Sequence, residues 1–187
     1  MIRLIPFHAT AGTSAIRLPR WDPAGGAWPL PPPVAAAPIP GLETLHAAPS
    51  SLRELAILAV DDDRTTLELT GLIFEEHGAH VTCVDTAEDA LSALAAAPLG
   101  AKGFGLLLSD IGLPGMDGYA LLRYVRRELQ IPPNGLPAIA VTAFARAEDR
   151  QMALRAGFQA HLPKPWDAEQ LVAMSLRLIA QAARSGF

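Results

Sequence analysis

The sequence has little cysteine, no excess of basic residues and no long apolar run, and each absence excludes a class of protein. The single cysteine, Cys83, cannot form an intramolecular disulfide, which favours a reducing, cytoplasmic location. The 15 Lys and Arg against 19 Asp and Glu give a net charge of −4, so direct nucleic-acid binding is not expected. No apolar run reaches the length of a membrane span, so no membrane contact is expected either.

Proline divides the chain near residue 51. Ten of the 17 prolines fall in residues 1–51, in runs such as PLPPPVAAAPIP that neither a helix nor a sheet can hold. We interpret residues 1–51 as a Pro/Ala-rich disordered tail or linker, or as sequence upstream of the true start codon. A transit-type leader is the less favoured alternative, although residues 1–21 carry three arginines and no acid. Residues 52–183 are then one folded domain, and 184–187 a C-terminal tail.

Five apolar runs of strand length each precede a run whose apolar residues recur at helical spacing. This alternation predicts an α/β fold, a doubly wound five-stranded parallel sheet with helices on both faces. The predicted strands and their following helices are 54–60 with 63–78, 79–85 with 86–97, 104–110 with 117–129, 137–143 with 147–157, and 159–163 with 167–183.

The residues at the strand ends form the candidate site. In such a sheet the ligand binds beyond the carboxyl ends of the strands, near the point where the strand order reverses. The first predicted strand ends in Asp61 and Asp62, and the third ends in Asp110. The fourth ends in Thr142, and the fifth leads to Lys164. Three carboxylates, a hydroxyl and an ammonium are therefore expected to meet at one edge of the sheet.

This set of groups suits phosphoryl chemistry with a divalent metal. Asp61, Asp62 and Asp110 together are a cluster of hard oxygen ligands of the kind that holds Mg²⁺ and leaves room for phosphate oxygens. A carboxylate kept ionised beside the metal can attack phosphorus and form an aspartyl phosphate. Lys164 and Thr142 would then contact the phosphoryl oxygens, one as a cation and one as a hydrogen-bond donor.

Other residues have simpler structural explanations. Three aspartates stand just before predicted helices and are expected to cap them: Asp63, Asp117 and Asp167. Thr86, with Asp89 three residues later, has the spacing of a capping box. Cys83, on a predicted strand, is expected to be a small buried hydrophobic residue.

Four motifs resemble the markers of response regulator receiver domains, in order and at fitting spacing over about residues 53–182. They are VDDD, LLSDIGLPGMDGY, AVTA and HLPKPW. The resemblance implies the flavodoxin-like fold of these domains, with Asp110 as the phosphoacceptor. It also implies Mg²⁺ as the cofactor, held by Asp61, Asp62, Asp110 and the backbone carbonyl of Gly112.

The same resemblance implies a switch and a responding surface. Thr142 would be the switch hydroxyl, Lys164 would contact the phosphoryl group, and the Lys164–Pro165 peptide bond would be cis. His161 stands where receivers usually have a switching Tyr or Phe, and we leave it open between a switch residue and a packed core residue. The responding surface would be the fourth helix, the fifth strand and the fifth helix, where a partner or a second copy, giving a homodimer, would dock.

The implied function is that of a receiver in a two-component phosphorelay, which takes a phosphoryl group from a histidine kinase or a histidine phosphotransfer protein. Such a chain is not an enzyme beyond its own phosphorylation and dephosphorylation. The sequence ends soon after the fifth predicted helix. This suggests either a chemotaxis-type single-domain regulator or a receiver separated from a hybrid histidine kinase.

Three other classes of protein fit less of the sequence. VDDDRTTL also suits a haloacid dehalogenase-type phosphatase with Asp61 as nucleophile and Asp63 as general acid and base. Such an enzyme needs an acidic pair after its lysine to hold Mg²⁺, but after Lys164 only Asp167 and Glu169 follow, both at the start of a predicted helix. The phosphatase interpretation also leaves Asp110 without a role. A non-phosphorylated docking module should have broken metal or acceptor positions, and here all are intact. A nucleotide-binding Rossmann domain needs a Gly-rich phosphate loop after its first strand, where this chain has DDDR.

Overall fold

The computed structural model describes residues 51–97, 103–143 and 146–185. Residues 1–50, which are nearly all of the predicted tail, and residues 186–187 lie outside the described residues. Five strands and five helices alternate along the described chain, in the order that the sequence predicts. None of these helices is both long enough and apolar enough to cross a membrane.

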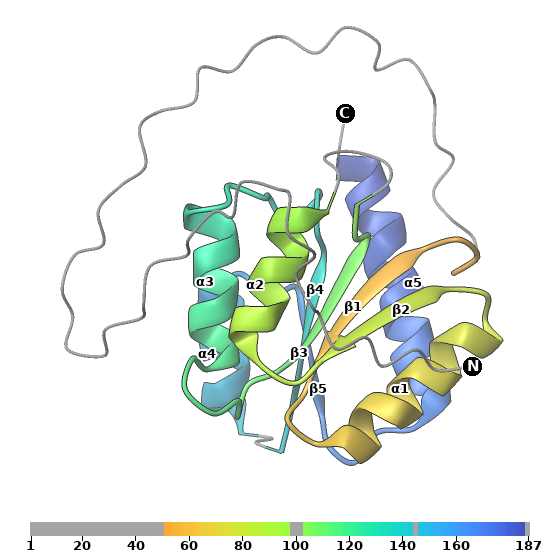
Figure 1. The fold of residues 1–187 in the computed structure, drawn as a ribbon, viewed down its shortest axis with the longest axis horizontal. Coiled ribbons are helices and arrows are strands. Elements are labelled where there is room, and N and C mark those ends of the chain that lie inside the picture. Colours follow the sequence, from red (N-terminus) through yellow and green to blue (C-terminus); the bar gives the residue numbers. More distant parts are fainter. Residues whose placement is uncertain (1–50, 98–102, 144–145, 186–187) are drawn as a thin grey trace, which may run out of the picture. The chain divides into compact units, whose positions relative to one another are not determined.

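Five parallel strands form the central sheet, in the order β2-β1-β3-β4-β5 (Figure 1). Their bounds are β1 Ala56–Val60, β2 His80–Val84, β3 Leu106–Asp110, β4 Ala138–Thr142 and β5 Ala160–Pro163. The order reverses at β1, because β2 lies on one side of it and β3 on the other. The doubly wound parallel sheet is thereby confirmed, and its switch point lies at the ends of β1 and β3.

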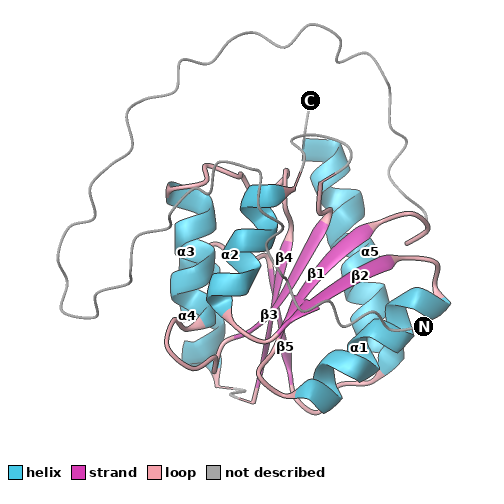
Figure 2. Cartoon of the chain, in the orientation of Figure 1, coloured by secondary structure: helices cyan, strands magenta, loops and turns pink. Residues whose placement is uncertain are grey.

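The helices cover both faces of the sheet. Their bounds are α1 Arg64–Glu76, α2 Ala87–Ala96, α3 Gly118–Arg127, α4 Ala147–Ala156 and α5 Ala168–Ser185. Helices α1 and α5 lie on one face, and α2, α3 and α4 lie on the other (Figure 2). This division follows from the strand order, since right-handed crossovers to the two sides of β1 place their helices on opposite faces.

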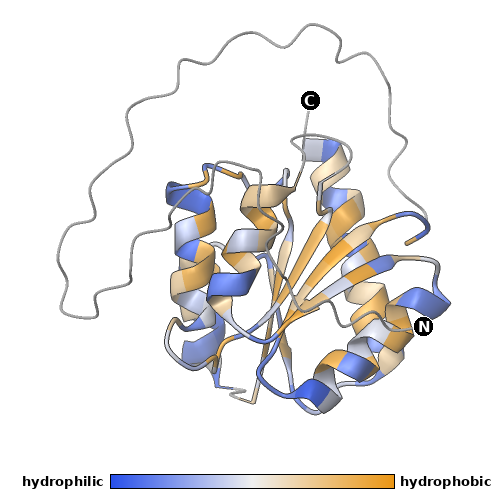
Figure 3. Cartoon of the chain, viewed as in Figure 1, coloured by the Kyte–Doolittle hydropathy of each residue, from blue (hydrophilic) through white to orange (hydrophobic). Residues whose placement is uncertain are grey.

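The central strands are apolar on both faces because helices cover both (Figure 3). Ile57 and Ala59 of β1 belong to the core cluster that α1 and α5 complete with Leu67 and Leu171. Leu58, the alternate residue of β1, is also fully buried. Each such Leu or Ile side chain contributes about 1.5–3 kcal/mol through its burial. The continuous apolar runs of the sequence are therefore explained by a two-sided core.

The predicted helix caps are confirmed. The Thr86 hydroxyl accepts a hydrogen bond from the Asp89 amide at 3.1 Å and donates one to the Asp89 carboxylate at 2.8 Å. Each capping aspartate accepts a hydrogen bond from an amide of the following helix: Asp63 from Thr65 at 2.9 Å, Asp117 from Ala120 at 2.6 Å and Asp167 from Gln170 at 2.7 Å.

Most element boundaries differ by one or two residues from the sequence prediction. β1 begins at Ala56, two residues late, because Glu54 has a left-handed backbone with φ of 62° and cannot continue a strand. α4 ends at Ala156, because Gly157 adopts the left-handed conformation, with φ of 107°, that closes many helices. α5 continues to Ser185, two residues past the expected domain boundary at 183.

Gly118 lets the first turn of α3 approach the end of β3 more closely than any other residue could. A Cβ atom added there would lie 2.2 Å from the Asp110 carbonyl oxygen and 3.0 Å from the Ile111 Cα. The Gly118 amide also donates a hydrogen bond to the Ile111 carbonyl at 3.1 Å. Both crowding atoms are backbone atoms, so no side-chain rotation relieves the clash.

We expect Gly118→Ala to lower the free energy of unfolding by about 1–3 kcal/mol, because the backbone must shift to admit a methyl group. Urea denaturation followed by circular dichroism measures the change. Gly71→Ala is the matched control: Gly71 is also buried and helical, and the nearest atom to its added Cβ is Cys83 Sγ at 3.9 Å. Equal destabilisation by the two substitutions would contradict the proposed clash.

Cys83 is half-buried on β2, packs against the core cluster, and donates from its thiol to the Leu67 carbonyl at 3.6 Å. Burial raises the pKa of this thiol to about 11, so little thiolate exists near neutral pH.

We expect the folded protein to react with iodoacetamide at pH 8 on the order of a hundredfold more slowly than the urea-unfolded protein. Similar rates in the two states, followed by intact mass, would show the burial argument to be wrong.

Candidate functional site

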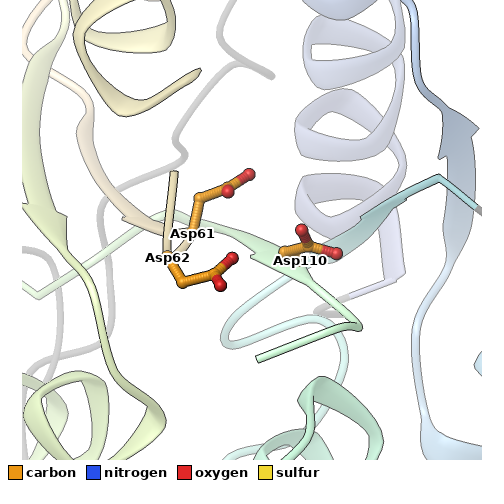
Figure 4. A group of neighbouring side chains, drawn as sticks. All are labelled: Asp61, Asp62 and Asp110. Atoms are coloured by element: carbon orange, nitrogen blue, oxygen red, sulfur yellow. The ribbon is translucent and has the colours of Figure 1, made fainter. Parts of the chain in front are cut away.

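The register of the central strands brings three aspartates together at the switch point. Val60 pairs with Ser109 across β1 and β3, so the residues that follow each of them, Asp61 and Asp110, lie at the same level. Asp62 follows Asp61 in the turn out of β1. One oxygen from each of the three carboxylates lies within 4.8 Å of the others (Figure 4). The cluster predicted from the strand ends is therefore present.

Lys164 lies between two of these carboxylates. Its Nζ donates to Asp61 Oδ2 at 2.7 Å and to Asp110 Oδ2 at 2.8 Å. Burial disfavours the charge on Lys164, but the hydrogen bonds to Asp110 and Asp61 outweigh it and raise the pKa of the ammonium above its ordinary value. Lys164 is therefore a stable cation that offsets part of the repulsion within the cluster.

Asp61 is the most deeply buried member of the cluster, with 4% of its surface exposed. Its Oδ1 accepts the Asp63 amide at 3.0 Å, and its Oδ2 accepts Lys164. Burial raises the pKa of Asp61, and the bonds from Lys164 and the Asp63 amide only partly offset this rise. A divalent cation would favour the ionised form further, which is consistent with a metal-binding carboxylate.

Asp110 is fixed at the end of β3 by its neighbours. Its Oδ1 accepts the Gly112 amide at 3.0 Å, which holds the following loop against the carboxylate. Ser109 is fully buried, and its hydroxyl donates to the Asp110 carbonyl at 2.8 Å. The Asp110 side chain itself is 12% exposed. The metal-binding role of the Gly112 carbonyl stays a prediction.

The other predicted residues lie on the neighbouring strands β4 and β5. Thr142, the last residue of β4, is fully buried and pairs with Pro163, which places it beside Lys164. The Lys164 amide donates to the Thr142 carbonyl at 2.7 Å, and the Lys164–Pro165 peptide bond is cis, as the resemblance implied. His161 is half-buried on β5, three residues before Lys164.

The residues present fit a magnesium ion. Three carboxylate oxygens at close range, one of them on the exposed Asp62, are hard ligands that leave coordination positions open for water and phosphate oxygens. The Lys164 ammonium is close enough to Asp110 to contact a group bound to it. The arrangement can hold a divalent cation beside a nucleophilic carboxylate and stabilise an incoming phosphoryl group.

The phosphatase alternative is not supported by the contacts of Asp63. Both of its carboxylate oxygens are used by the first turn of α1: Oδ1 accepts the Thr65 amide and Oδ2 accepts the Thr66 hydroxyl, each at 2.9 Å. These hydrogen bonds, the Thr66 hydroxyl first, lower the pKa of Asp63. A general acid and base needs a free oxygen and a pKa nearer neutrality.

Two residues near the site were not identified from the sequence. Trp166 and Asp61 together line a cavity of about 10 Å³ behind the carboxylates, between the sheet, α1 and α5. Gly118 packs directly on the Asp110 carbonyl. A glycine at the first position of a helix is a poor helix former, and this was the available signal for a close approach. Trp166 is the last residue of the HLPKPW motif, but the sequence pattern indicated no role for it.

Comparison with known proteins gives a consistent result. The family model of the response regulator receiver domain matches residues 57–175. An uncharacterised 14.6 kDa protein from the sodA1 3′ region of Leptolyngbya boryana is 46% identical over 134 residues, which cover 70% of this chain and 92% of that protein. The sensor histidine kinase GacS of Pseudomonas protegens is 33% identical over 136 residues, which cover 72% of this chain but only 14% of the kinase.

A solved structure agrees with these sequences. The receiver domain protein of Methanospirillum hungatei, described as CheY-like, is 30% identical, with a TM-score of 0.62. The match covers 71% of this chain and 99% of that one. The flavodoxin-like fold expected from the resemblance is thereby confirmed.

We expect Lys164→Met to raise the affinity for Mg²⁺ by roughly tenfold, because a cation that competes for Asp61 and Asp110 is removed. Isothermal titration calorimetry on the two proteins measures the difference. Arg123→Met, at an exposed position of α3, removes the same charge away from the site and should leave the affinity nearly unchanged. Weaker or equal binding by Lys164→Met would contradict the competition.

Proposed function

Because this chain belongs to the response regulator receiver family, whose members accept a phosphoryl group in two-component signalling, we propose that Asp110 is the acceptor. The observation that supports this choice best is the position of its carboxylate. Of the two described carboxylates that contact Lys164, Asp110 has the more exposed side chain, 12% against 6% for Asp61, and it lies beside Asp61 and Asp62. Asp61 is more deeply buried, and Asp63 is engaged as a helix cap.

In the proposed reaction, a carboxylate oxygen of Asp110 attacks the phosphorus of the donor. An O–P bond forms as the bond from phosphorus to the donor's histidine nitrogen breaks, and that nitrogen keeps the electron pair. The Lys164 ammonium turns from the free carboxylate to the transferred phosphoryl oxygens, and the Thr142 hydroxyl donates to another of them. The product is an aspartyl phosphate on Asp110.

Mg²⁺ is the cofactor that we propose for this site, held by Asp61, Asp62, Asp110 and the backbone carbonyl of Gly112. When bound, it neutralises charge on the phosphoryl oxygens during transfer. The three carboxylates repel the anionic donor without it, and Lys164 alone carries too little charge to balance them. The oxygen-only set of ligands supports magnesium over softer metals.

The phosphoryl group adds about −1.5 to −2 charges and three acceptor oxygens at Asp110. It favours an active state only through contacts that are better in that state, and we propose Thr142 and His161 as the residues that respond. Moving the population from 1:99 to 99:1 requires about 5.5 kcal/mol of differential interaction, which a few charge-assisted hydrogen bonds supply.

We further propose that the donor is a histidine kinase or a histidine phosphotransfer protein, and that the protein acts in the cytoplasm. The proposed responding surface is α4, β5 and α5, which would receive a partner or a second copy. Met152 and Leu154 of α4 support this assignment, since they are large apolar side chains with 49% and 50% of their surface exposed. Apart from handling its own phosphoryl group, the domain needs no further catalysis for this role.

The test is intact mass after incubation of the full chain with Mg²⁺ and acetyl phosphate. We expect one phosphate adduct in the wild type, none in Asp110→Asn, and at least about tenfold slower formation in Asp61→Asn because the metal is held more weakly. Chelation of Mg²⁺ should abolish the adduct.

Glu88→Gln is the matched control, since it removes an exposed carboxylate of α2 that belongs to neither the metal cluster nor a cap bond. An adduct that persists in Asp110→Asn and is lost in Asp61→Asn would favour the phosphatase alternative. No adduct in any protein would favour the docking module.

A further inference from the structure

Two side chains of α3 form hydrogen bonds with α4 or with the residue that caps it. Tyr119 and Arg126 stand seven residues apart on α3, which places them on the same side of the helix, two turns from each other. Tyr119 donates from its hydroxyl to the Asp149 carbonyl in the first turn of α4. Arg126 donates to the carbonyl of Gly157, the residue that caps the other end of α4.

The attachment at Gly157 involves several hydrogen bonds from a charged donor, although the two bonds to the Gly157 carbonyl are long. The Arg126 guanidinium donates to the Ile131 carbonyl at 3.0 Å, to the Leu136 carbonyl at 2.8 Å and, from Nε and Nη2, to the Gly157 carbonyl at 3.4 and 3.3 Å. Burial lowers the pKa of Arg126 to about 10, so the group remains charged at neutral pH. One cation therefore joins α3, the loop before β4 and the end of α4.

Gln159 strengthens the same attachment. Its amide nitrogen also donates to the Gly157 carbonyl, and its amide oxygen accepts the backbone amide of Ala138 in β4 at 2.7 Å. A Cβ atom on Gly157 would lie 3.0 Å from Arg126 Cγ, so the helix cap and the arginine side chain are closely packed. This end of α4 is held to two strands and to α3.

The attachment at the first turn is weak. It consists of one hydrogen bond of 3.4 Å between Tyr119 and the Asp149 carbonyl, near the long limit for such a bond. The Tyr119 ring is buried, with 8% of its surface exposed. Among the α4 side chains that are described, only the small Ala153 and Ala156 are buried. Another described hydrogen bond of this turn, from the Arg146 amide to the Asp149 carboxylate at 3.1 Å, lies within α4 itself and does not tie it to α3.

Tyr119 is also close to the proposed acceptor along the chain. It follows Gly118, whose backbone packs on the Asp110 carbonyl oxygen so closely that no Cβ fits between them. Across the sheet, β4 ends at Thr142, four residues before the N-cap of α4 at Arg146. A change at the site can therefore be passed to the first turn of α4 through α3 and through the end of β4.

We propose that α4 turns about a pivot at Gly157, fixed by Arg126, and that the Tyr119 hydroxyl is a latch that holds the first turn of α4 until Asp110 is phosphorylated. The release by phosphorylation rests on the proposed function. The Tyr119 latch on Asp149 and the pivot at Gly157 do not. Opening the latch changes the orientation of Met152 and Leu154, the exposed apolar residues of α4. Tyr119 and Arg126 act as positioning residues, since neither touches the reacting atoms.

Hydrogen exchange measured by mass spectrometry on the full chain tests this, with residues 147–152 and 153–158 followed separately. In the wild type, Mg²⁺ with acetyl phosphate should speed exchange in 147–152 only. Tyr119→Phe should speed exchange there by about two- to tenfold without phosphorylation, the range expected for one net hydrogen bond, and phosphorylation should then add little. Tyr124→Phe, the other tyrosine of α3, is the matched control.

Arg126→Gln should instead speed exchange in residues 153–158, with the exposed Arg127→Gln as its control. If Arg126→Gln does not fold, Gln159→Met removes a second donor to the same carbonyl. The proposal is overturned if Tyr119→Phe matches the wild type in 147–152, or if either variant speeds both segments equally. Absence of a phosphate adduct by intact mass would refute the proposed function, while the result for unphosphorylated Tyr119→Phe would still decide the latch.

Discussion

The repulsion among three carboxylates gathered at one sheet edge is the constraint on which the rest of this site depends. Asp61 and Asp110 are held at the same level by the pairing of β1 with β3, so the fold itself brings like charges together. Lys164 compensates by contacting both of them. The Lys164 ammonium can reach both carboxylates because β5, which pairs with β4, ends at Pro163, one residue before Lys164. Sheet register, rather than any one loop, therefore determines the electrostatics of the site.

Most of the fold and the members of the site could be predicted, because they depend on local signals. Apolar runs define the strands, a polar residue before each helix defines its start, and parallel strands place their carboxyl ends at a common edge. The sequence pattern could not predict that Lys164 contacts two carboxylates, or that Arg126 joins three segments. Such contacts form between side chains of elements that are far apart in the sequence. The periodicity of apolar residues does not indicate which of these side chains are long enough to touch.

The three consecutive aspartates illustrate how identical residues receive different environments. Asp61 is buried and bonded to Lys164, Asp62 is exposed, and Asp63 caps α1 with both oxygens. The difference arises where an extended strand turns into a helix, since successive side chains then point in unrelated directions. Serine, threonine or asparagine can replace an aspartate that caps a helix, but none supplies the charge of a metal ligand.

Trp166 gives the domain an intrinsic optical reporter. Trp166 and Asp61 line the same small cavity, and the other two tryptophans of the chain, Trp21 and Trp28, belong to the proline-rich segment outside the described residues. Indole emission depends on nearby charge and on solvent contact. A change of ionisation or occupancy at the carboxylates is therefore registered by one fluorophore within the folded domain.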